Sequence, residues 1–337
     1  MPIEFERSVD EARFKSPFEE FETVAETIEH RTDPLTGRSV RIVPQAAPTP
    51  DPDDRPDLDD AIGDGEECFF CPHNVEDVTP EYPAFVGVDR GARGEATSFP
   101  NLFPYSKHSN VVALTEDHFR PMDELGADRL ADGLGCALEY VQAVADHDDS
   151  AFASINMNFL PPSGSSIVHP HMQAIADDHG TDRQARIARR EREYEAEHGA
   201  RYYDDLLERE RGGDRYVGDT GDVEWIAPFA PLGKWHVTGV ADTTGLLDPD
   251  DGAVDGFATG IANVLDYYAD LGLNTFNVGL RFARRNPASQ VAVDVLARSV
   301  FEDRYINDMF YFQTVHDQRS IDVAPETYAS EVAAHFE

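Results

Sequence analysis

The sequence is poor in basic residues. Among its 337 residues, Lys and Arg total 28 against 65 Asp and Glu, which gives a formal net charge of −37. Because nucleic acid is bound mainly by neutralising its phosphates with basic side chains, this balance argues against a nucleic-acid partner. An acidic surface is typical of proteins kept soluble in strong salt, where screening removes self-repulsion. We therefore expect a halophilic, haloarchaeal source.

Long apolar runs and abundant cysteines are also missing. No apolar run approaches the roughly 20 residues that cross a bilayer, and residues 1–20, MPIEFERSVDEARFKSPFEE, are charged throughout. We expect a cytoplasmic protein with no membrane partner. The 3 cysteines are too few for a disulfide framework, so a metal-binding or redox role is considered first.

A chain of this length exceeds what one hydrophobic core usually covers, so two domains or two fused halves are expected. We predict an N-terminal segment with an acidic, Pro- and Asp-rich linker over 1–66 and a catalytic half with a zinc site over 67–180. A charged helical linker is predicted over 181–220 and a second, degenerate half over 221–337. Within the linker, alternating charges at helical spacing indicate a solvated helix that bridges the halves.

An internal repeat supports two halves. Lys107 opens KHSNVVALT and Lys234 opens KWHVTGVAD, and the later segments LEYVQAV and LDYYADL keep the same offset of 127 residues. In each copy the first strand is followed by an amphipathic helix and then by further strands. The repeat therefore predicts the same local fold twice.

The copies differ at their last strand, where the first reads SSIVHPHMQAIA. When Val168 is aligned with Val291, two of three polar side chains of the first copy align with apolar residues and the third aligns with an aspartate. The aligned pairs are His169 with Ala292, His171 with Asp294, and Gln173 with Leu296. Because the fold does not require these polar residues in the second copy, they are candidates for function.

On a strand, residues two apart share a face at about 6.5 to 7 Å, so His169, His171 and Gln173 form one row. Pro170 lacks an N–H donor and places this row at a strand edge or end. The preceding turn, 163–166, has backbone N–H groups that could hold a phosphate without basic side chains. The alternative is a set of hydrogen-bonded polar residues on a half-exposed strand.

The segment ECFFCPHN supplies two cysteines, Cys68 and Cys71, at a spacing that lets both thiolates bind one tetrahedral Zn²⁺. Cys136 lies in an apolar helix and is read as a core residue. The other ligands should then be histidines. A redox C-x-x-C is the competing interpretation, although no thioredoxin-like context surrounds it.

Four histidines are candidate ligands: His73, His108, His118 and His169. Of these, His118 lies just beyond a predicted strand end and His169 begins the polar row, so these two are favoured. With His169 on the metal, His171 projects along the same face as a free imidazole. A neutral imidazole can attack phosphorus and store a nucleotidyl group as a phosphoramidate, and the Gln173 amide can donate to a non-bridging oxygen.

Five segments, in order DPLTGRSVRIVP, ECFFCPHN, SFPNLF, EDHFRPMDEL and GSSIVHPHMQ, resemble the galactose-1-phosphate uridylyltransferases of the histidine-triad superfamily. The resemblance is specific from about residue 30 to 178 and fainter beyond. It implies an α+β fold of two fused histidine-triad-like halves, mainly antiparallel sheet with helices packed on it, and a homodimer. It also implies ping-pong chemistry in which a uridylyl-histidine carries UMP from UDP-glucose to a hexose-1-phosphate.

The resemblance also implies roles for individual residues. His171 would be the nucleophile, assisted by Gln173. One structural Zn²⁺ would be held by Cys68, Cys71, His118 and His169. The substrate contacts would be Asn101, Asn158, Gly164, Ser166, Tyr311 and Gln318.

Three departures bear on the substrate. A basic run that the resemblance leads us to expect after Pro44 is replaced by Gln45, Ala46 and Ala47. Asp294 and Leu296 stand where some family members have a second metal site, so we expect no second metal ion here. Phe312 stands beside Tyr311 in place of a glutamate. Two alternatives therefore stay open. One is a nucleoside-diphosphate-sugar phosphorylase that uses inorganic phosphate, and the other is a non-catalytic, zinc-stabilised nucleotide-binding protein.

Overall fold

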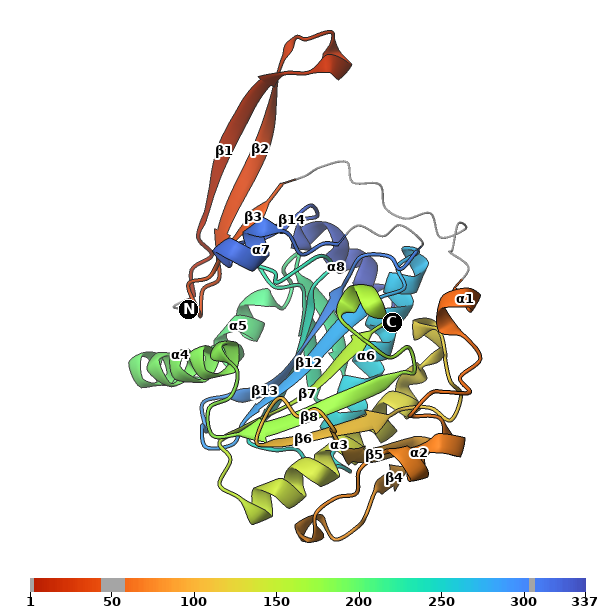
Figure 1. The fold of residues 1–337 in the computed structure, drawn as a ribbon. Coiled ribbons are helices and arrows are strands. Elements are labelled where there is room, and N and C mark those ends of the chain that lie inside the picture. The colour runs from red at the N-terminus through yellow and green to blue at the C-terminus, as the bar shows by residue number, and fades with distance from the viewer. Residues whose placement is uncertain (1–2, 44–57, 303–306) are drawn as a thin grey trace.

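The computed structural model describes residues 3–43, 58–302 and 307–337, and a ten-stranded sheet forms its centre (Figure 1). The first half contributes β4 (Gly91–Arg93), β5 (Ala96–Pro100), β6 (His108–Ala113), β7 (Phe152–Phe159) and β8 (His171–Asp177). The second half contributes β9 (Tyr216–Thr220), β10 (Val223–Ile226), β11 (Val237–Thr244), β12 (Phe276–Ala283) and β13 (Gln290–Ala297). Neighbouring strands of this sheet run antiparallel.

The strand order is β4-β5-β6-β8-β7-β12-β13-β11-β10-β9. The two halves of this order mirror each other. From the outer edge inward, β4, β5, β6, β8 and β7 correspond to β9, β10, β11, β13 and β12. The halves join where β7 pairs with β12, with Asn158 opposite Asn277. A long helix follows the third strand of each half, α3 (Gly126–His147) and α6 (Gly252–Asp270). This arrangement confirms the predicted α+β fold and its duplication.

The strand register corrects one detail of the sequence alignment. Ala113 pairs with His171, and the residue 127 positions after Ala113, Val240, pairs with Ala292. With the first strands aligned in this way, Ala292 is the counterpart of His171. Asp294 is the counterpart of Gln173, two residues away from the expected match. The alignment by valines missed this shift because strand residues two apart have the same inward or outward orientation.

The hydrophobic core lies between the sheet and the two long helices. On β8, Met172 and Ala174 are buried on the helix side, so the alternating residues His171 and Gln173 lie on the opposite, outer face. The predicted apolar faces of both helices are confirmed as buried. They comprise Leu130, Leu134, Leu138 and Val141 of α3 and Phe257, Ile261, Leu265 and Tyr268 of α6.

The charged segment after residue 180 forms two helices instead of one solvated helix. They are α4 (Asp182–His198) and α5 (Tyr202–Glu210), separated at Gly199, whose φ of 74° ends the first helix. Tyr203 and Leu206 of α5 pack against the outer face of the second half. Glu191 of α4 is also fully buried. The helices therefore cover part of the sheet, which the charge pattern did not predict.

A four-stranded sheet lies beside the main one. It comprises β1 (Arg7–Lys15), β2 (Thr23–Thr32), β3 (Ser39–Ile42) and β14 (Arg319–Ile321), and β14 runs parallel to β3. The β1–β2 hairpin projects from the body of the molecule (Figure 1). The remaining α-helices of the described residues are α1 (Asp59–Ile62), α2 (Pro72–Val78), α7 (Tyr311–His316) and α8 (Pro325–Ala333).

Gln45, Ala46 and Ala47, whose lack of charge was noted in the sequence, lie outside the described residues. None of the described helices combines the length and the apolar character that a bilayer-spanning segment needs.

Candidate active site and metal centre

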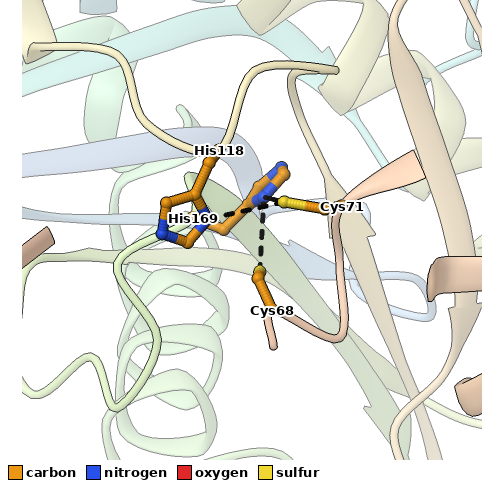
Figure 2. A group of neighbouring side chains, drawn as sticks. All are labelled: Cys68, Cys71, His118 and His169. Carbon is orange, nitrogen blue, oxygen red and sulfur yellow. Dashed lines mark hydrogen bonds between the residues drawn. The ribbon is translucent and has the colours of Figure 1, made fainter. Parts of the chain in front are cut away.

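Four side chains that are distant in sequence converge at one end of the first half. Cys68 and Cys71 lie in the turn that leads into α2, His118 follows β6, and His169 lies two residues before the start of β8. Their ligand atoms all lie within 4.8 Å of one another, and the side chains point toward a common centre (Figure 2). These are the four residues that the sequence favours as metal ligands. His73 and His108 are not in this cluster.

The distances between sulfur and nitrogen suit a tetrahedral ion. The Nδ1 atom of His169 lies 3.6 Å from Sγ of both Cys68 and Cys71, and Nδ1 of His118 lies 3.5 Å from Sγ of Cys71. Zinc bonds of about 2.3 Å to sulfur and about 2.05 Å to nitrogen imply S···N edges of about 3.6 Å in a tetrahedron. The donor set therefore fits one metal ion held by two thiolates and two imidazoles.

Backbone carbonyls fix the tautomers that such an ion requires. The Nε2 atom of His169 lies 2.8 Å from the Thr115 carbonyl oxygen, and that of His118 lies 3.0 Å from the Ile62 carbonyl oxygen. A carbonyl only accepts, so both Nε2 atoms carry the hydrogen and both Nδ1 atoms keep a lone pair. Burial also lowers the pKa of His169 to about 4, which keeps this ring neutral.

For the thiols, the buried environment disfavours the deprotonated form that binds a metal. Burial, together with the neighbouring Cys68, raises the pKa of Cys71 to about 12. Two adjacent thiolates in this setting are unfavourable unless a cation offsets their charge. The pair therefore suits a resident cation better than a free thiol role.

A glycine lets the chain pass close to one ligand. Gly65 has a φ of 76°, in the left-handed region, and a Cβ built on it would lie 2.6 Å from Cγ of His118. Any larger residue would therefore displace the His118 ring or the backbone. This close packing holds the imidazole in its position at the metal centre.

His171 lies next to this cluster but is not one of its members. Its Nδ1 atom lies 2.8 Å from the His169 carbonyl oxygen, so Nδ1 must donate and Nε2 keeps its lone pair. The Phe70 ring packs edge-on against it at 5.2 Å between centroids. Burial lowers the pKa of His171, which keeps the ring neutral.

The polar row continues from His171 across two strands. The amide nitrogen of Gln173 lies 3.5 Å from Nε2 of His171, and its amide oxygen lies 3.4 Å from the amide nitrogen of Asn101. Asn101 is itself oriented by the backbone N–H of Phe103, which donates to its side-chain oxygen at 2.9 Å. The structure thus brings together His171, Gln173 and Asn101, while their roles toward a substrate stay predictions.

The second half supplies two residues that sequence reasoning missed. Asn277 donates to Oδ1 of Asn158 at 2.6 Å and to the Ser163 carbonyl oxygen at 3.0 Å. Arg298 in turn donates to Oδ1 of Asn277 at 2.6 Å and pairs with Asp308 at 2.6 Å. The sequence offered one signal for Asn277: both copies of the repeat carry an asparagine at the same strand, Asn158 on β7 and Asn277 on β12. Asn158 is therefore held in place by the other half of the chain.

The turn after β7 is strained, and its N–H groups are largely occupied. Leu160 has a φ of 66° and Gly164 a φ of 99°. The N–H groups of Ser163 and Gly164 donate to the carbonyls of Leu160 and Pro161 at 3.1 and 2.9 Å. The expected backbone cradle for a phosphate is thus mostly used within the turn. Gly164 and Ser166 are nevertheless exposed, and Gly164 lies beside the Asn158 side chain.

Tyr311 and Gln318 lie away from the polar row. Tyr311, on α7, packs against the rings of Phe310 and Phe312, and Gln318 donates to the Ser39 carbonyl oxygen at 3.2 Å. Among the described residues, no contact joins either side chain to His171. Their predicted role toward a sugar stays a prediction.

Sequence comparisons relate the chain to a protein of similar length. No protein-family model matches the chain. A protein of Archaeoglobus fulgidus, described only as uncharacterized, is 35% identical over 331 residues, which is 98% of either chain.

Three solved structures share the fold. The ADP-glucose phosphorylase of Arabidopsis thaliana with bound ADP-glucose has a TM-score of 0.69 at 16% identity and covers 91% of this chain and 98% of its own. A galT-like protein of the same plant gives 0.68 at 16%, with the same coverage. A uridylyltransferase gives 0.66 at 17% and covers 91% of this chain and 97% of its own. The chain therefore has the galT-like fold of two histidine-triad-like halves, and it belongs to the same family as the Archaeoglobus protein.

Proposed function

We propose that the protein is a nucleotidyltransferase that works through a covalent nucleotidyl-histidine at His171. One observation carries the proposal: the carbonyl of His169 accepts from Nδ1 of His171 and leaves Nε2 with a free lone pair beside the Gln173 amide. An unprotonated imidazole nitrogen of fixed orientation is what attack on phosphorus requires. The fold shared with a uridylyltransferase and with ADP-glucose phosphorylase supports this choice.

The reaction proceeds in two displacements. Nε2 of His171 attacks the phosphorus that carries the nucleoside of a nucleotide sugar, so a P–N bond forms as the P–O bond to the sugar phosphate breaks. A phosphate oxygen of the acceptor then attacks the same phosphorus, and the P–N bond breaks. The Gln173 amide donates to a non-bridging oxygen. The His169 carbonyl stabilises the cationic imidazole that forms in the first step.

In this proposal the metal is structural. A Zn²⁺ held by Cys68, Cys71, His118 and His169 would fix the ligand loops and so hold the His169 carbonyl against the His171 ring. Asn101 and Asn158 would contact the nucleotide, and Gly164 and Ser166 the phosphates. The donor would be UDP-glucose, and the acceptor a hexose-1-phosphate such as galactose-1-phosphate.

A phosphorylase is the second candidate, with inorganic phosphate as the acceptor. It is favoured because ADP-glucose phosphorylase shares the fold and because Tyr311 and Gln318, the expected sugar contacts, do not meet the polar row within this chain. A homodimer would be the way to bring such residues to the site. Exposed apolar side chains flank the site, namely Phe69, Leu102 and Phe103, and burying them would favour association.

The test uses the two nucleotide sugars UDP-glucose and ADP-glucose, each with galactose-1-phosphate or with inorganic phosphate. Mass spectrometry without acceptor should detect an acid-labile nucleotidyl adduct on His171, and product analysis with each acceptor should separate transferase from phosphorylase. His171→Asn should abolish adduct and turnover, whereas His73→Asn, a nearby histidine outside the cluster, should retain both. An adduct formed by His171→Asn at the wild-type rate would refute the assigned nucleophile. Binding of a nucleotide sugar without adduct or product would favour a non-catalytic binding protein.

A further inference from the structure

A cavity of about 410 Å³ lies where the N-terminal segment, helices α4 and α5 and the second half meet, and no residue of the His171 row lines it. It is open to solvent on one side and is lined by the turn between β2 and β3, the first turns of α4, helix α5, and strands of both sheets. The lining residues that matter below are four arginines, Arg38, Arg183, Arg186 and Arg319, and four aspartates, Asp33, Asp182, Asp294 and Asp317. Its volume falls within the range of about 300–1,000 Å³ usual for small-molecule sites.

The gathering of arginines is unexpected in a chain with a net charge of −37. Burial, with a smaller effect of the neighbouring Arg183 and Arg319, lowers the pKa of Arg38 to about 10, although Asp33 and Asp294 act in the opposite direction. Nε of Arg319 is buried without a hydrogen-bond partner among the described residues. Among the described residues, the hydrogen bonds of the Arg38 guanidinium go to the carbonyl oxygens of Ala230 and Pro231. These cations are held close together without a full complement of anions.

The aspartates of the cavity do not neutralise them. Asp294 is already engaged, because it accepts from Arg183 at 2.8 Å and from Arg281 at 3.0 Å. Asp33 accepts the N–H and the hydroxyl of Thr36 at 2.7 and 2.6 Å. Asp182 and Asp317 are exposed at the rim. Arg38, Arg186 and Arg319 therefore remain available to a ligand.

We propose that this cavity is a second binding site, for a small phosphate-bearing anion. Guanidinium groups bind phosphate oxygens through paired, charge-assisted hydrogen bonds. The N-terminal end of the 17-residue helix α4 adds partial positive charge, because Asp182 and Arg183 of its first turn line the cavity. The site contains no residue of the His171 row, so the inference is independent of the proposed function.

Calorimetric titration of the full-length protein with inorganic phosphate tests the proposal. Arg186→Gln and Arg319→Gln should each weaken phosphate binding by about tenfold, the loss expected for one charge-assisted pair. Arg189→Gln removes the same charge from α4 at an exposed position outside the cavity and should bind as the wild type does. Circular dichroism would verify that each variant is folded.

Three results would overturn the proposal. One is the absence of saturable phosphate binding to the wild-type protein. Another is wild-type affinity in both cavity variants, which would place any bound phosphate elsewhere. The last is an equal loss in Arg189→Gln, which would indicate a general effect of charge.

Discussion

In the first half, the outer face of the sheet carries His171 and Gln173 at the edge of the metal centre, whereas in the second half the same face lies beneath α4 and α5. The counterpart of His171 is Ala292, which packs in a small hydrophobic cluster with Leu206 and Leu207 of α5. The counterpart of Gln173 is Asp294, which is buried and paired. One scaffold therefore supports a polar row on one side and a covered, ion-paired surface on the other.

The two faces differ in how fully one polar side chain on each, Asp294 and His171, is hydrogen-bonded. Asp294 accepts from Arg281, Arg183 and Thr238, and its carboxylate lies 3.0 Å from Nε2 of His236. In contrast, the hydrogen bond that Nε2 of His171 makes within the described part of the chain is a long one, 3.5 Å from the amide nitrogen of Gln173. A closed network of this kind stabilises a fold, while an oriented lone pair that is only weakly hydrogen-bonded is available to a substrate. The comparison suggests that the first half performs the chemistry and the second half stabilises it.

The largest expected effect comes from opening the closed network. Asp294→Ala would leave Arg281 buried without its carboxylate, and we expect the free energy of unfolding to fall by about 3–5 kcal/mol. Gln173→Ala, at the corresponding position of the first half, should change stability by less than about 1 kcal/mol but reduce adduct formation strongly. Urea denaturation of both variants, together with the adduct assay, measures the two effects. Equal stability losses in the two variants would remove the contrast between the halves.

The metal centre gives the next effect, and it is confined to the first half. Cys68→Ser should reduce zinc from one equivalent per chain to near zero and lower the free energy of unfolding by about 3 kcal/mol, as for loss of a ligand present at about 100 times its Kd. Hydrogen exchange should rise in β6 and β8 and stay unchanged in β11 and β13. Cys136→Ser, in the core of α3, is the matched control and should retain zinc. Undiminished zinc in Cys68→Ser would refute the ligand assignment.

Much of this asymmetry was visible in the sequence, because His169, His171 and Gln173 break an otherwise regular repeat. Periodicity placed the helices and their buried faces, and ligand chemistry selected the four metal-binding candidates. What could not be predicted depends on tertiary contacts. Asn277 and Arg298 reach the site only because β12 pairs with β7. The charges of α4 predict a solvated helix, yet Glu191 is enclosed when the helix packs against the sheet.

That buried carboxyl group, on the helix that packs against the second half, gives the smallest predicted effect. Glu191 accepts from the hydroxyl of Ser289 and faces the charge of Arg281. Burial raises the pKa of Glu191 from 4.5 to about 7. Between about pH 4.5 and pH 7 the folded protein therefore keeps this proton, whereas the unfolded chain has lost it. The free energy of unfolding consequently falls as the pH rises through this range.

Replacing the carboxyl by a neutral amide should remove this loss. The free energy of unfolding of Glu191→Gln should equal that of the wild type near pH 4.5 and exceed it by about 2 kcal/mol at pH 8. The full pKa shift corresponds to about 3 kcal/mol, and relaxation of the structure around the ionised carboxylate reduces this value. Denaturation curves across this pH range measure the difference, with Glu197→Gln on the exposed face of α4 as the control. A difference that did not change with pH would mean that Glu191 ionises normally. Water would then reach the carboxyl group of Glu191, and α4 would pack less tightly against the second half than a purely stabilising role requires.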